Sequence, residues 1–108
     1  MGEIIYNKLV RDEIPTIIEN DNQTPAVRIL GDKEFRRKLL EKLVEEANEL
    51  LESDGDIGER ADVAEVLKAL DAILGYTDDE IETTRATKAE KRGGFEKRIF
   101  LEKAITND

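Results

Sequence analysis

Two acidic stretches lie at the centre of the sequence pattern: Glu45-Glu46-Ala47-Asn48-Glu49 and, shortly after it, Glu59-Arg60-Ala61-Asp62. Both stretches lie inside patterns typical of amphipathic helices, because apolar residues recur around them at the spacing of one helical face. These apolar residues are Phe35, Leu39, Leu40, Leu43, Val44, Ala47, Leu50 and Leu51, then Val63, Val66, Leu67, Ala69, Leu70, Ile73 and Leu74. The pattern predicts two helices that pack through these faces.

The helical turn also decides which acidic residues face the partner helix. At about 100° per residue, Glu46 falls at the edge of the apolar arc, Glu49 lies beside it and Glu45 lies further toward solvent. On the second helix, Glu59 and Asp62 lie in line with apolar positions. Four carboxylates would then converge in a half-buried space, which is costly unless they are paired or bind a cation. A hard divalent cation such as Mg²⁺ prefers oxygen ligands of this kind.

A purely structural explanation of the acidic residues is also open. Lys42 can pair with Glu46 one helical turn away, and Asp56 can cap the second helix with Glu59 at the third helical position. Either arrangement would leave the carboxylates as a solvated or capping surface. Two acidic clusters on consecutive helices, both turned into the apolar arc, favour the metal site.

Turn and capping residues predict where the helices begin and end. The expected elements are a short helix capped by Asp12, an extended piece over 26–30, a long helix from Lys33 to about Ser53 capped by Asp32, a helix over Ile57 to Leu74, and a further helix that begins with a capping box at Thr77 and ends at Gly93-Gly94. Because the link around Gly55 is short, the two long helices should form an antiparallel hairpin. The expected fold is all-α: an antiparallel helical bundle built on this central hairpin and completed by oligomerisation, with residues 1–108 forming a single domain.

Composition narrows the chemistry. The chain has no cysteine and no histidine, so thiolate and imidazole ligands are excluded. Any chemistry must then use carboxylates, Lys, Arg, Tyr or metal-bound water. A net charge of -9 argues against binding of a nucleic-acid polymer. No apolar run is long enough for a membrane span and no secretory signal is evident, so we expect a cytoplasmic protein without a membrane partner.

Basic residues near both ends are candidates for binding phosphate oxygens. Arg provides a planar, bidentate fork and Lys a point charge, although both residue types more often serve helix termini and solubility. The candidates for substrate binding are Lys8, Arg11, Lys88, Lys91 and Arg92, with Arg85 on the same predicted helix.

The pattern Glu45-Glu46-x-x-Glu49 followed by Glu59-x-x-Asp62 resembles the EExxE…ExxD signature of the all-α nucleoside triphosphate pyrophosphohydrolases. The opening Tyr6-Asn7-Lys8-Leu9-Val10-Arg11-Asp12-Glu13-Ile14-Pro15 and the closing Lys91-Arg92-Gly93-Gly94-Phe95 resemble a MazG-like subgroup labelled phosphoribosyl-ATP pyrophosphohydrolase-like. The resemblance therefore extends over most of the chain.

The resemblance implies a helical, Mg²⁺-dependent enzyme, with Mn²⁺ as a possible substitute, that cleaves a nucleotide substrate between its α and β phosphates. Glu46, Glu49, Glu59 and Asp62 would be the metal ligands, and Glu45 an outer carboxylate that orients water or a second ion. With no histidine, Glu45 or Glu49 is the candidate general base. The interval between Glu49 and Glu59 is shorter than is usual in that family, so either the loop is trimmed or Asp62 and Glu65 carry more of the second half.

Three alternatives remain open from the sequence. The substrate could be phosphoribosyl-ATP in histidine synthesis rather than surplus or non-standard nucleoside triphosphates. The carboxylates could bind transition metals, although di-iron bundles usually add Glu-x-x-His motifs. The chain could also be a non-catalytic helical interaction protein. A homodimer or homotetramer is expected in any case, because the hairpin presents more apolar surface than the rest of the chain can cover.

Overall fold

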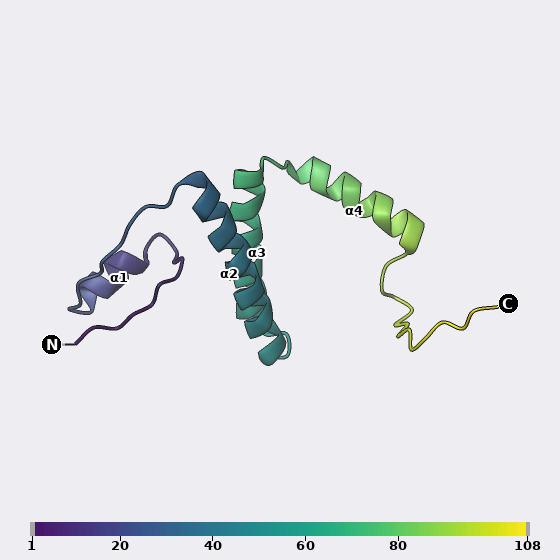
Figure 1. The fold of residues 1–108 in the computed structure, drawn as a ribbon, viewed down its shortest axis with the longest axis horizontal. Helices are drawn as coiled ribbons and strands as arrows, with labels where there is room; N and C mark the ends of the chain where they lie inside the picture. The colour runs from purple at the N-terminus through teal and green to yellow at the C-terminus, as the bar shows by residue number, and fades with distance from the viewer. Residues whose placement is uncertain (1, 108) are drawn as a thin grey trace. The chain divides into compact units, whose positions relative to one another are not determined.

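The structure, a computed structural model, describes residues 2–107 and contains four α-helices and no strand within that range (Figure 1). The helices are α1 (Ile14–Asn20), α2 (Asp32–Glu52), α3 (Ile57–Leu74) and α4 (Asp78–Arg92). The described residues form two compact units that divide between Gly75 and Tyr76. The all-α prediction is confirmed, and the predicted extended piece over 26–30 has no regular secondary structure.

The first unit is built on a hairpin of α2 and α3. Figure 1 shows the two helices side by side, with α3 running back along α2. Leu39 on α2 and Val66 and Leu70 on α3 form the buried core, and partly buried residues pack around it: Leu9, Phe35, Leu43, Ala69, Ile73 and Leu74. The predicted antiparallel hairpin is therefore confirmed, and the bundle beyond it remains a prediction.

Polar contacts in the link fix how α3 leaves α2. The Asp56 carboxylate accepts hydrogen bonds from the backbone N–H groups of Gly58 and Glu59, at 3.0 and 3.3 Å, as expected for a helix N-cap. The Asp56 N–H in turn donates to Ser53 Oγ at 3.1 Å. Gly75 ends α3 in the left-handed conformation, with φ 78°, so both predicted ends of this helix are confirmed.

Two predicted caps are wrong. Helix α2 begins at Asp32, and its N-cap is Gly31, whose carbonyl accepts a hydrogen bond from the Phe35 N–H at 2.9 Å. Asp32 instead occupies the first turn. Its negative charge there interacts favourably with the positive end of the helix dipole. Asp12 lies in a turn before α1, and the N-cap is Glu13, which makes no side-chain capping bond.

The second unit contains α4 and the chain that follows it. Thr77 Oγ1 accepts a hydrogen bond from the Glu80 N–H at 3.1 Å, which confirms the predicted cap, and Gly93 ends the helix. No residue of α4 is buried. Large apolar side chains after the helix are also exposed: Phe95, Ile99, Phe100, Leu101 and Ile105.

No described helix has the length and apolar content that a membrane span requires.

Candidate metal and phosphate site

Three carboxylates from the two helices of the hairpin converge. Glu46 and Glu49 come from α2 and Glu59 from α3, and one carboxylate oxygen of each lies within 4.8 Å of the others. We call these three residues the acid cluster. Glu46 is buried, while Glu49 and Glu59 are partly buried. The helical pattern therefore predicted correctly that Glu46 faces inward.

The cap of α3 leaves Glu59 free to join the acid cluster. In a reciprocal capping box, Glu59 would accept a hydrogen bond from the Asp56 N–H. That N–H donates to Ser53 Oγ instead. Glu59 Oε2 is buried and has no hydrogen-bond partner. The capping explanation of the sequence thus accounts for Asp56 but not for the Glu59 carboxylate.

Glu46 is the most deeply buried carboxylate of the cluster. It is 7% exposed, and its Oε2 atom has no hydrogen-bond partner. Burial, and then the neighbouring Glu49 carboxyl, raises the pKa of Glu46, while the Lys42 charge acts in the opposite direction. A cation that binds the unpaired oxygen would therefore stabilise this buried carboxylate.

Lys42 contacts one carboxylate of the acid cluster and one outside it. Its Nζ atom lies 3.5 Å from Glu46 Oε1 and 3.5 Å from Glu45 Oε1, and its side chain is only 16% exposed. The pairing of Lys42 with Glu46, which the sequence offered as a structural explanation, is therefore present. It involves one oxygen of Glu46 and leaves Oε2 open.

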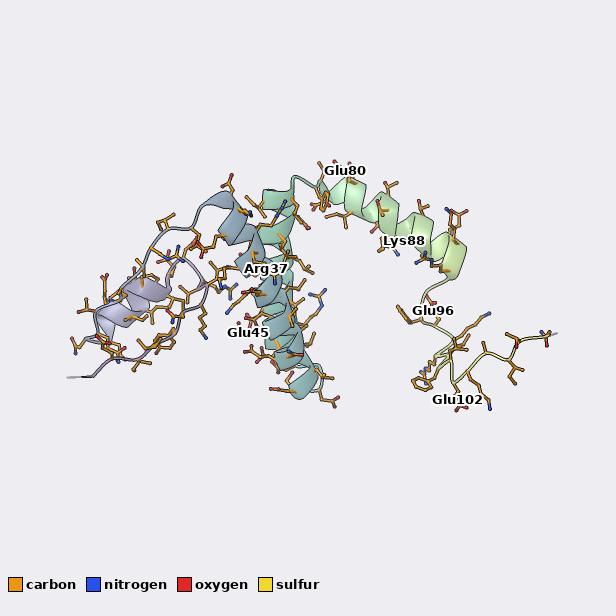
Figure 2. All side chains as sticks on the ribbon, viewed as in Figure 1. Arg37, Glu45, Glu80, Lys88, Glu96 and Glu102 are labelled. Atoms are coloured by element: carbon orange, nitrogen blue, oxygen red, sulfur yellow. The ribbon has the colours of Figure 1, made fainter. Side chains whose placement is uncertain are left out.

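Glu45 and Asp62 lie outside the group of three carboxylates. Glu45 lies on α2 (Figure 2). Its Oε1 atom lies 3.5 Å from Lys42 Nζ on the same helix. The Asp62 Oδ1 atom accepts a hydrogen bond from Arg11 Nη1 at 3.3 Å, and Arg11 Nη2 lies 4.0 Å from a Glu65 oxygen. Asp62 is still close enough for its charge to help raise the pKa of Glu46, after the larger effects of burial, Glu49 and Lys42. It therefore borders the cluster with its own carboxylate engaged by Arg11.

The residues of the acid cluster fit a hard divalent cation. The donor set consists of carboxylate oxygens, which Mg²⁺ and Mn²⁺ prefer. Two of these oxygens, Glu46 Oε2 and Glu59 Oε2, are buried without a partner, which is unfavourable unless a cation or water binds there. Both observations favour a site built for a positively charged ligand.

The predicted phosphate-binding residues divide between the two units. In the first unit, Arg11 contacts Asp62, and Lys8 lies in a depression beside Lys42. In the second unit, Lys88 lies on α4 (Figure 2), and Lys91 and Arg92 lie in its last turn. Their binding roles remain predictions.

The depression that contains Lys8 is also lined by two lysines of α2. Lys38 and Lys42 face the same depression as Lys8, and neither was among the candidates. Their spacing on α2 does place them on one helical face. No sequence pattern shows that the N-terminal segment brings Lys8 to the same depression.

Part of the chain is similar in sequence to a known protein. An uncharacterized protein of Mycolicibacterium smegmatis is 45% identical to this chain over 47 residues, which cover 44% of this chain. The matched part spans about half of that relative, 48% of its length. No family model and no solved structure matches the chain.

Proposed function

We propose that the protein is a Mg²⁺-dependent nucleoside triphosphate pyrophosphohydrolase, which releases nucleoside monophosphate and pyrophosphate and limits surplus or non-standard nucleotides. The observation that carries the proposal is the acid cluster, in which two buried oxygens from different helices lack partners. The motif resemblance supplies the reaction. Cytoplasmic location belongs to the same proposal.

The residues would divide the work as follows. Glu46, Glu49 and Glu59 would hold the cation, and Asp62 would join them once its carboxylate exchanges Arg11 for the cation. The cation would neutralise charge on the phosphate oxygens during in-line attack. Glu45 or Glu49 would accept the proton of the attacking water, since the chain has no histidine.

A homodimer or homotetramer is part of the proposal. Val44 and Leu51 on α2 are 62% and 77% exposed, and Leu40 on the same helix is also exposed. Their spacing follows one stripe of the helix. Three apolar residues alone form the buried core of the described chain, so a second copy that covers this stripe would bury apolar surface that the monomer leaves in water.

The test is a product analysis with a panel of ribo- and deoxynucleoside triphosphates and phosphoribosyl-ATP, in Mg²⁺ and in EDTA. We expect metal-dependent release of pyrophosphate, with nucleoside triphosphates preferred over phosphoribosyl-ATP. Glu49→Gln should lower turnover by about a hundredfold or more while circular dichroism shows unchanged helix content. The matched control is Glu52→Gln, which alters an exposed carboxylate on the same helix.

Turnover that is equal in Mg²⁺ and EDTA, or equal in Glu49→Gln and the wild type, would refute the proposed function. Preference for phosphoribosyl-ATP would leave the proposed pyrophosphohydrolase reaction intact and would place the protein in histidine synthesis.

A further inference from the structure

A depression of about 210 Å³ lies beside the acid cluster, between the N-terminal segment and α2. We call it the lysine depression, because its lining includes three lysines as well as two glutamates and an asparagine: Lys8, Lys38, Lys42, Glu41, Glu45 and Asn7. It is formed entirely within the first unit.

The N-terminal segment lies beside α2 around Asn7 and Leu9. Asn7 has φ 44°, in the left-handed region that asparagine tolerates better than most residues. Leu9 then packs against the hydrophobic core, so the segment is anchored on the hairpin. Lys8, between these two residues, lies in the depression with its ammonium group 6.0 Å from the centre of the Tyr6 ring.

The lining is positively charged although the protein is acidic. Three ammonium groups face two carboxylates there, in a chain whose net charge is -9. Lys38 pairs with Glu41 at 3.3 Å, and Lys42 pairs with Glu45 at 3.5 Å. Among the described residues Lys8 has no acidic partner within ion-pair distance, so it is available to an anion.

Lys42 connects the depression with the acid cluster. The same ammonium group lies 3.5 Å from Glu45, which lines the depression, and 3.5 Å from Glu46, which belongs to the cluster. A cation that binds Glu46 would replace Lys42 as its counter-ion. The Lys42 ammonium could then donate its hydrogen bonds to an anion in the depression.

A ligand that fits both places must carry a bound cation next to a chain of anionic oxygens. A magnesium-bound polyphosphate has this chemistry. We propose that the lysine depression binds the terminal phosphates of the substrate, with Lys8, Lys38 and Lys42 as hydrogen-bond donors to the phosphate oxygens. This inference rests on the proposed function for the cation and adds the site of the phosphate chain.

The test is calorimetric titration of the full chain with inorganic tripolyphosphate, in Mg²⁺ and in EDTA. We expect Mg²⁺ to strengthen binding, and each of Lys8→Met, Lys38→Met and Lys42→Met to weaken it by about tenfold or more, because each removes a charge-assisted hydrogen bond. The matched controls are Lys33→Met and Lys68→Met, which remove the same charge from exposed positions of the hairpin and should change binding by less than about twofold.

Lys8→Met is the decisive variant, because it should change tripolyphosphate binding without affecting folding. Lys42→Met leaves Glu46 without its cation and can destabilise the hairpin, whereas Lys8 is exposed and makes no ion pair within the described residues. A Lys8→Met protein with wild-type melting and wild-type tripolyphosphate affinity would overturn the inference. Equal losses in the lysine variants and in both controls would also overturn it, because the effect would then be one of net charge.

A second ligand separates this inference from the proposed function. A nucleoside monophosphate lacks the terminal phosphates, so the three lysine substitutions should not change its affinity. Failure of the proposed function would instead show as a wild-type protein that neither binds Mg²⁺ nor hydrolyses any triphosphate. Lysine-dependent tripolyphosphate binding in that protein would still support the depression as a polyphosphate site.

Discussion

Glu46 is the buried carboxylate of the acid cluster, and its charge is therefore the one that burial destabilises most. Its carboxylate is buried, one oxygen faces Lys42 and the other has no partner. A proton or a cation can satisfy the open oxygen, and the two therefore compete. The consequence is a pH dependence that reverses in sign when metal is present.

Glu46→Gln should abolish this dependence. Because burial and Glu49 raise the pKa of Glu46, its protonation stabilises the folded metal-free protein below the ordinary glutamate pKa of about 4.3, and this stability is lost as pH rises through the raised value. At neutral pH the variant should unfold with a free energy about 1 kcal/mol higher than the wild type, and a melting point roughly 4–8 °C higher. Thermal melts across pH, with and without Mg²⁺, measure both.

Glu52→Gln is again the control, since it removes the same charge from an exposed position on the same helix. If Glu46→Gln melted lower at every pH and kept the full stabilisation by Mg²⁺, Glu46 would be a structural partner of Lys42 alone.

Because Arg11 contacts Asp62, substitutions of these two residues should change the Mg²⁺ affinity in opposite directions. Arg11→Met should raise the affinity severalfold, because it removes a cation that competes for the Asp62 carboxylate, and Asp62→Asn should lower it. Stability should change by less than about 1 kcal/mol in both variants, since the pair is exposed. Titration calorimetry with Mg²⁺ alone provides the measurement. Unchanged affinity in Asp62→Asn would mean that Asp62 only anchors Arg11.

These residues also show how far sequence reasoning reaches. The inward position of Glu46 follows from the helical repeat, which depends on neighbours a few positions away. Arg11 meets Asp62 across a separation of 51 positions, through a segment without regular structure, so no local pattern predicts it. The same is true of Lys8 and the lysine depression.

At the scale of elements, the link between α2 and α3 determines where Glu59 lies. Sequence predicted the bounds of α3 correctly because a side-chain cap and a left-handed glycine mark its ends. It misplaced the cap of α2 because Gly31 caps through its backbone carbonyl, which leaves no side-chain signature.

Asp56→Ala should destabilise the hairpin by about 1 kcal/mol, because two N–H groups at the start of α3 lose their acceptor. It should also weaken Mg²⁺ binding, since Glu59 lies in that first turn. The matched control is Asp54→Gly in the same link, where φ 56° suits glycine and no stability should be lost. Chemical denaturation of both variants measures the difference. Equal losses would assign the effect to charge rather than to capping.

At the scale of the whole molecule, the described chain buries little apolar surface for its length. The sequence located the apolar stripe of α2, but a periodic pattern cannot reveal which surface covers it. Only the residues facing α3 find a partner in the structure, while Leu40, Val44 and Leu51 remain exposed.

Val44→Lys should therefore shift the protein toward the monomer, because it places a charge in the centre of this stripe. Sedimentation equilibrium should show a lower mass than the wild type at the same concentration, together with a lower melting point. Asn48→Lys introduces the same charge at an exposed polar position on α2 and should leave the mass unchanged. A wild-type protein that is monomeric at all concentrations would disprove the oligomer.

The short link between α2 and α3 also bears on the order of events during folding. All three residues of the acid cluster belong to one helical hairpin, so the cluster assembles through local contacts, which form quickly. The like charges of Glu49 and Glu59 must then meet in an early step, before the flanking segments are in place. A divalent cation would consequently be expected to accelerate folding of the hairpin, and not merely to slow its unfolding.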